Sequence, residues 1–216
     1  MTEHMQKFLL QFLRPSILAT ALIFAGVPSA NAQSGGFVGG VAGITFASET
    51  SSVFAAQAGG RVARQLFVFG EFGRMQNVLP EEAQGDLDDA TEFLESQLGT
   101  TVDLDVRVPA IYGLAGIRWS PDDRIAPFLE AGAGFARLSL DLTAEVAGID
   151  VTDEVEDQLD REDLEVTEFL LAFGGGLNTR LTERIRLDIG YRYNRVFTDD
   201  PAIDVNMAYA ALKFWF

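Results

Sequence analysis

Catalysis near neutral pH usually depends on a histidine or a cysteine, and this chain offers very little of either. Its single histidine, His4, falls within the first 32 residues, and there is no cysteine. Histidine is the side chain whose unperturbed pKa lies near neutrality, so residues 33–216 lack the usual general base. No two acidic residues are spaced as a defined carboxylate pair. We therefore expect no enzyme, no catalytic residue and no cofactor.

Metal binding is the second chemistry to consider, because residues 75–106 contain many acidic side chains and neither Lys nor Arg. A calcium loop of the common kind needs alternating Asp residues, a glycine and a later Glu. Residues 86–91 lack that glycine and spacing, and residues 150–155 fail as well. We expect a solvated acidic surface without a dedicated metal site. Diffuse Mg²⁺ or Ca²⁺ binding that bridges these segments to anionic lipopolysaccharide stays open as an alternative.

Alternation of apolar and polar residues predicts the elements that would position the remaining charges. A period of two is that of a β-strand, whose successive side chains face opposite ways. Turn-type residues, such as those at 120–124, separate the alternating segments. Eight strands are predicted, at about residues 36–47, 53–64, 66–78, 105–119, 125–140, 167–179, 185–197 and 203–216. The connections after the third and fifth strands are long, and those after the second, fourth and sixth are short.

The strand at 185–197 shows two faces most clearly, with Ile185, Leu187 and Ile189 alternating with Arg186 and Asp188. The strands at 125–140 and 167–179 also alternate, with large apolar residues on one face and mostly small residues on the other. Glycine runs at 132–134 and 174–176 are read as room in a narrow interior, since no helix with a ribose-binding acid follows them. The first strand is too rich in glycine for its faces to be assigned.

Both ends of the chain indicate export to a membrane. Residues 1–32 have a charged lead, a short apolar run and a small-x-small ending at Ala30 and Ala32, which predicts a signal peptide cut before Gln33. The apolar run is shorter than the roughly 20 residues that a membrane-spanning helix needs. The last strand carries Leu212, Phe214 and Phe216 on one face, and aromatic strand ends are typical of barrels in lipid.

Charge and hydropathy limit the possible partners and the fold class of the protein. The formal net charge of −16 argues against nucleic acid as a partner. No stretch after residue 32 is long and apolar enough for a membrane helix, so a membrane-embedded chain would have to close as a β-barrel. We predict one domain at 33–216, an all-β, eight-stranded antiparallel up-and-down transmembrane β-barrel. Short turns would lie in the periplasm and long acidic loops outside, with short helices at about 86–98, capped by Asp86, and 152–160, both over the barrel mouth.

Charged residues on the predicted inner face form the candidate site. An eight-stranded barrel is about filled by its own side chains, and a charge in that space must be paired. We therefore predict an ion-pair ladder that plugs the lumen; a small conductance is the alternative. The predicted ladder consists of Glu71, Arg118, Glu130, Asp188, Arg192 and Lys213, with Arg61 as a further candidate.

Four segments and the aromatic terminus resemble the small eight-stranded outer-membrane barrels of the OmpA-like and opacity-protein group, also called the porin family. They are residues 111–119 (IYGLAGIRW), 124–135 (RIAPFLEAGAGF), 173–177 (FGGGL) and 187–193 (LDIGYRY). The resemblance implies a Gram-negative cell envelope. It also implies that Leu212, Phe214 and Phe216 are part of the signal read by the barrel-assembly machinery.

These inferences lead to a functional expectation. We expect an integral outer-membrane barrel, monomeric, in contact with outer-membrane lipid and lipopolysaccharide, with a structural or surface-interaction role in envelope integrity and loop display. Passage of small solutes or ions through a narrow pore is the main alternative. A soluble secreted β-sandwich that binds a ligand is the other, because strands of a sandwich also alternate.

Overall fold

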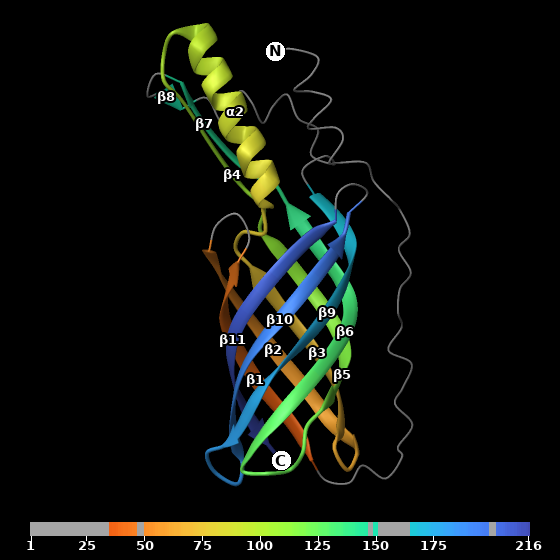
Figure 1. The fold of residues 1–216 in the computed structure, drawn as a ribbon. Coiled ribbons are helices and arrows are strands. Elements are labelled where there is room, and N and C mark those ends of the chain that lie inside the picture. The colour runs from red at the N-terminus through yellow and green to blue at the C-terminus, as the bar shows by residue number, and fades with distance from the viewer. Residues whose placement is uncertain (1–34, 47–49, 147–148, 151–164, 199–201) are drawn as a thin grey trace.

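The computed structural model describes residues 35–46, 50–146, 149–150, 165–198 and 202–216. Eight antiparallel strands close into a single barrel in the order β1-β11-β10-β9-β6-β5-β3-β2 (Figure 1). Their bounds are β1 (Gly36–Phe46), β2 (Thr50–Ala63), β3 (Leu66–Met75), β5 (Ala110–Trp119), β6 (Ile125–Ser139), β9 (Glu165–Arg180), β10 (Ile185–Phe197) and β11 (Ile203–Trp215). The predicted eight-stranded antiparallel barrel is therefore confirmed.

Closure of the barrel joins the first strand to the last. β1 pairs with β2 on one side and with β11 on the other. Gly36 N donates to Phe216 O at 3.1 Å, and Phe216 N donates to Gly36 O at 3.0 Å. Because the sheet closes on itself in one layer, the β-sandwich alternative is excluded.

The alternation of faces is confirmed wherever it was assigned. In β10, the side chains of Arg186, Asp188 and Arg192 are buried, while Ile189 and Tyr191 are exposed. The unassigned β1 follows the same rule. Its inward residues are Phe37, Val41 and Thr45, and its outward residues include Val38, Ile44 and Phe46. Large apolar side chains thus cover the outside of the cylinder, as a lipid-facing wall requires.

The predicted strand at 105–119 is wrong as a single element. It divides into β4 (Val102–Arg107) and β5 at Pro109, which has no N–H to donate to the sheet. The strand predicted at 66–78 also ends earlier, at Met75.

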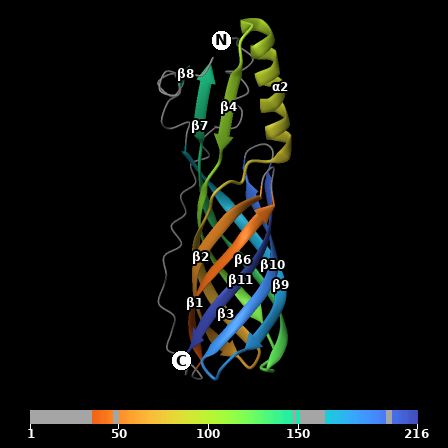
Figure 2. The same cartoon turned by 90° about the vertical axis from the view of Figure 1, so that its left-hand side faces the viewer.

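The connection after β6 contains two strands that were not predicted, and β4 extends beyond the start of the predicted strand at 105–119. β4 pairs with β7 (Asp141–Val146), and the two-residue β8 (Ile149–Asp150) pairs with β7. The pairing of Ala110 with Leu138 in the barrel continues as Arg107 with Asp141 without a change of register. The β5–β6 hairpin therefore runs on beyond the barrel, and Figure 2 shows this projection above the barrel end.

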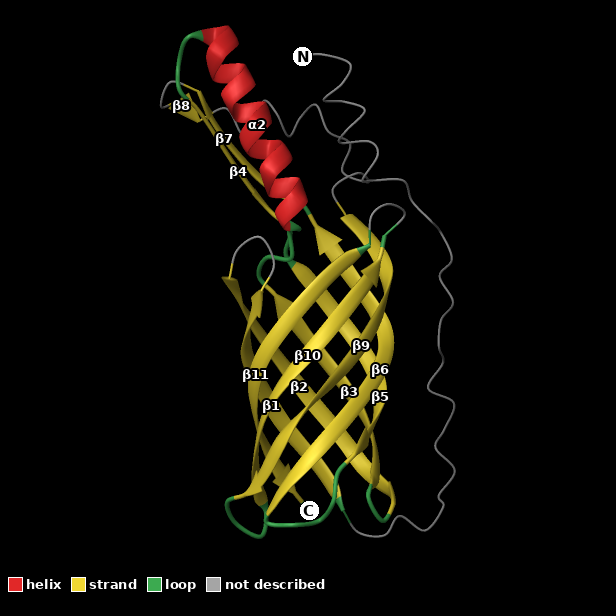
Figure 3. Cartoon of the chain, viewed as in Figure 1, coloured by secondary structure: helices red, strands yellow, loops and turns green. Residues whose placement is uncertain are grey.

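One helix, α2 (Glu81–Leu98), lies in the long connection after β3. The predicted end is confirmed, since Gly99 adopts φ 62° and its N–H donates to Glu95 O at 2.9 Å. The predicted start is wrong. Pro80 is the N-cap and lies six residues before Asp86, and Asp86 is an exposed helix residue, not a cap. Figure 3 shows α2 extending away from the barrel beside β4, and not across its mouth.

The helix predicted at 152–160 lies outside the described residues. Within the described residues, no helix is both long and apolar enough to cross a membrane.

Candidate functional site in the barrel lumen

The structure brings all six residues of the predicted ladder into one buried network. They project inward from β3, β5, β6, β10 and β11, at levels set by the stagger of the strands. Their exposures are Glu71 4%, Arg118 4%, Glu130 6%, Asp188 0%, Arg192 1% and Lys213 2%. Arg61, the further candidate, lies nearer the turn end and is 20% exposed at its side chain.

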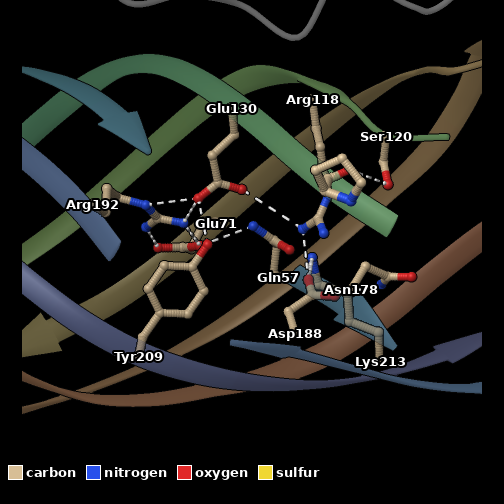
Figure 4. Close-up of polar contacts among 11 residues, drawn as sticks. Gln57, Glu71, Arg118, Ser120, Glu130, Asn178, Asp188, Arg192, Tyr209 and Lys213 are labelled. Carbon is tan, nitrogen blue, oxygen red and sulfur yellow. Dashed lines mark hydrogen bonds and ion pairs between the residues drawn. The ribbon is translucent and has the colours of Figure 1, made fainter. Parts of the chain in front are cut away.

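Arg192 is the centre of one half of this network (Figure 4). Its Nη2 lies 3.0 Å from Glu71 Oε2 and 2.7 Å from Glu130 Oε1. Two tyrosine hydroxyls also bind these carboxylates. Tyr112 donates to Glu71 at 2.8 Å, and Tyr209 donates to Glu130 at 2.7 Å. One guanidinium from β10 therefore bridges two carboxylates from β3 and β6, the strands on either side of β5.

Asp188 is the centre of the other half. It accepts from Arg118 Nη1 at 2.6 Å and from Lys213 Nζ at 2.7 Å. Arg118 also lies 3.7 Å from Glu130 Oε2, which joins the two halves. Three acids face three bases, so the network is neutral. Neutrality and hydrogen bonding offset the large cost of taking six charges out of water.

The sequence prediction missed the uncharged members of the network. Gln57 donates to Glu71 Oε2 at 3.0 Å, and Asn178 donates to Asp188 Oδ1 at 2.5 Å. Together with Tyr112 and Tyr209 they satisfy carboxylate lone pairs that the bases leave open. Gln57, Tyr112 and Tyr209 share a strand face with Arg61, Arg118 and Lys213, so alternation contained the signal for these three partners. Asn178 lies on β9, which carries no predicted charge, and faces inward with the small residues of that strand.

An apolar layer fills the lumen on the loop side of the charges. On each strand these residues lie nearer the loop end than the charged ones, and they belong to one buried cluster. Members of this layer are Val53, Met75, Val78, Ala110, Ala136, Leu138, Leu170, Ala172, Val196, Ile203, Val205 and Met207. The interior on the loop side of the charges is therefore mainly apolar, with Thr45 and Asn194 as buried polar members. On the turn side, Phe37 and Phe67 pack against Trp215.

Asn77 anchors the chain that covers this apolar layer. Its Oδ1 accepts from Leu79 N at 3.1 Å and from Val108 N at 3.1 Å, and its backbone pairs with Ser51 Oγ. Val78, which follows it, is completely buried in the cluster. The start of the α2 connection is thereby fixed into the barrel mouth.

The turn end carries a second cluster around Asp122. Arg180 and Arg186 approach its Oδ1 at 2.6 and 2.8 Å, and Arg61 approaches its Oδ2 at 3.7 Å. Partial burial acts to raise the pKa of Asp122, but the hydrogen bond and charge of Arg186, with Arg180 and Arg61, outweigh it. The pKa of Asp122 is lowered as a result.

The chemistry open to these groups is limited by their pairing. Each lumen carboxylate accepts hydrogen bonds from cations or tyrosines, so it is poorly placed to take a proton from a substrate. No group of three or more His, Cys, Asp or Glu residues suited to a metal ion occurs in the described part of the chain.

The remaining predicted residues concern the ends of the chain. Leu212, Phe214 and Phe216 face outward, with exposures of 55%, 45% and 69%. Ala30, Ala32 and Gln33, at the predicted cleavage point, lie outside the described residues.

Comparison with solved structures agrees with this architecture. Neisserial surface protein A has a TM-score of 0.54 and 17% identity, over 84% of this chain and 96% of that one. The N-terminal barrel of Pseudomonas aeruginosa OprF has a TM-score of 0.46 and 12% identity, over 86% and 99%. The Yersinia pestis attachment invasion locus protein Ail has a TM-score of 0.44 and 14% identity, over 83% and 97%. Similarity to the first of these shows the fold alone.

Comparison with known sequences shows the family of the chain. No curated protein matched it. The family model described as "Outer membrane protein beta-barrel domain" matches residues 16–216, which is nearly the whole chain. The chain therefore belongs to the outer membrane protein β-barrel domain family.

Proposed function

We propose that this protein is a closed structural barrel of the outer membrane, which holds the α2–β4–β7 projection on the outer side and conducts no solute. The filled lumen carries the proposal. The charge network forms the first barrier and the apolar layer the second, and an eight-stranded barrel has little interior space beyond its side chains. An ion would have to displace paired charges and then cross apolar side chains.

The external position of the projection rests on the lengths of the connections. Outer-membrane barrels have short periplasmic turns and longer external loops. Here the connections at 64–65, 120–124 and 181–184 lie at one end, and the α2 projection lies at the other. Its described side chains include exposed Asp86, Asp88, Asp89 and Glu92, so the displayed surface is acidic.

The proposal also covers the assembly of the barrel and the export of the chain. The outward Leu212, Phe214 and Phe216 support a role as the signal for the barrel-assembly machinery, and residues 1–32 would be removed after export. A monomeric barrel without enzymatic activity fits this role. Diffuse divalent cations at the acidic projection stay part of the proposal.

Planar-bilayer recording of the purified, folded barrel tests the closed lumen. We expect no conductance steps from the wild-type protein. A variant with Val53→Gly, Arg192→Gly and Met207→Gly, which truncates both layers, supplies the positive control if it folds. Reproducible steps from the wild type would replace the closed barrel with the narrow-pore alternative.

A further inference from the structure

A shallow groove of about 370 Å³ lies on the outer wall of the barrel, across β2, β3 and β5. Phe54 and Phe72 stand out from the wall with exposures of 58% and 66%, and Ile111 is 45% exposed. Small residues, among them Ala56 and Gly73, lie between them. The groove therefore has apolar sides and a low floor, a shape suited to an extended hydrocarbon chain.

Arg74 places one positive charge in this groove. It pairs in register with Phe54 on β2 and with Ile111 on β5, so the three outward side chains lie side by side. Arg74 is exposed, and it makes no hydrogen bond or ion pair with another described residue. Other outward arginines near the loop end do have acidic neighbours: Arg137 pairs with Glu165, and Arg195 lies 3.7 Å from Asp204.

The height of Arg74 on the wall matches a lipid headgroup. From Leu66 at the turn end, eight residues at about 3.3 Å each, tilted by about 40°, rise about 20 Å. The apolar band of an outer-membrane barrel is about 25 Å tall. Arg74 therefore lies near the loop-side edge of the band, where its guanidinium can meet a headgroup while Phe72 stays in hydrocarbon.

A second groove on the wall lacks such a charge. It is lined by Val38, Ile185, Leu212 and Phe214 at the turn end, and the one cation that borders it, Lys213, is 2% exposed and bound to Asp188. Lipid tails are the expected neighbours of both grooves. The first adds a guanidinium that has no acidic partner among the described residues, and its planar fork suits bidentate binding of phosphate.

We propose that the Phe54–Arg74–Ile111 groove is a binding site for the phosphorylated lipid anchor of lipopolysaccharide. An acyl chain lies along Phe54 and Phe72, and a phosphate accepts hydrogen bonds from Arg74. This inference rests on the proposed function, because that proposal puts the loop end in the outer leaflet. It differs from cation bridging by the acidic loops, since the contact is direct and needs no metal.

Native mass spectrometry of the folded barrel tests the site, with phosphorylated and dephosphorylated lipid A as probes. We expect Arg74→Gln to weaken binding of the phosphorylated form about tenfold, the scale of one charge-assisted contact. Arg74→Lys should keep most of the binding. Arg64→Gln, which removes an exposed charge at the opposite end, should leave it unchanged. Wild-type protein should bind dephosphorylated lipid A as weakly as Arg74→Gln binds the phosphorylated lipid.

Competition by inorganic phosphate at lipid-like concentrations would instead indicate a site for the free anion and would overturn the lipid assignment. Equal binding by wild type and Arg74→Gln, or equal loss in Arg64→Gln, would also overturn it. Heat-modifiability electrophoresis confirms that each variant is folded. A folded barrel without phosphate preference refutes only this site, whereas conductance by the wild type refutes the proposed function.

Discussion

Arg192 on β10 and Glu71 on β3 are 121 residues apart in the chain, yet Nη2 of the arginine donates to Oε2 of the glutamate at 3.0 Å. Both side chains are almost completely buried. Their contact crosses the lumen, so it ties together strands that are not neighbours in the sheet. Loss of one charge would leave its partners buried without compensation.

Arg192→Met should therefore destabilise the barrel strongly. Breaking a buried ion pair from one side costs about 3–5 kcal/mol, because the remaining charge stays desolvated. Here Glu71 would keep only Tyr112 and Gln57 as partners. Urea unfolding of the barrel in lipid vesicles measures the change. Arg64→Met, at an exposed turn position, is the matched control and should change the unfolding free energy by less than about 0.5 kcal/mol. A loss below about 1 kcal/mol for Arg192→Met would contradict the network's importance.

Asn77→Ala should loosen the base of the projection. The substitution leaves the N–H groups of Leu79 and Val108 without their acceptor, at about 1–3 kcal/mol for a buried donor. Limited proteolysis of folded protein should then cut within residues 76–109 faster than in the wild type, while the barrel strands stay protected. Asn77→Asp keeps an oxygen at the same place and is the control. Equal cleavage rates for wild type and Asn77→Ala would show that Val78 alone secures the segment.

Asp122 predicts a pH dependence at the turn end. Its folded-state pKa is lowered, so its contribution is present above the unfolded value of about 3.9 and is lost as pH falls through the folded pKa. The carboxylate is 47% exposed, so its ion pairs contribute only about 0.5–1 kcal/mol to the free energy of unfolding. Asp122→Asn should be less stable than wild type at pH 7, and the difference should disappear near pH 2. Asp123→Asn, an exposed neighbour, should show no such difference at either pH. A gap between wild type and Asp122→Asn that persists at pH 2 would exclude ionisation as its cause.

Much of this architecture could be predicted from alternation alone. In β10, one face carries Arg186, Asp188 and Arg192, and a single side-chain period fixes which residues share the lumen. The pairing could not be predicted in the same way. Arg192 meets Glu71 because of the stagger between strands that are far apart in the chain, and no local pattern encodes that stagger.

Errors outside the barrel have local physical causes. Pro109 interrupts a strand that otherwise continues in register. The predicted strand at 105–119 starts three residues after the start of β4 at Val102, because the acidic composition around Val102 and Leu104 favours a loop. Pro80 began α2 earlier than the expected Asp86 cap. Tyr112 and Tyr209 also face inward, but their hydroxyl groups carry no charge, so a pattern of charges does not point to them.

Close packing between strands predicts that the effect of a glycine-to-alanine substitution depends strongly on its position. A Cβ added at Gly176 would meet the carbonyl oxygen of Ile189 and the Cα of Gly190, the latter at 2.6 Å, and both are backbone atoms that cannot rotate away. Gly176→Ala should therefore cost about 1–3 kcal/mol through overpacking. At Gly40 an added Cβ has open space, so Gly40→Ala should be neutral or gain up to about 1 kcal/mol by restricting the unfolded chain. Urea midpoints of the two variants in the same vesicles compare them directly. Equal stability would mean that β9 and β10 can separate to admit a methyl group, in conflict with a tightly packed barrel wall at this level.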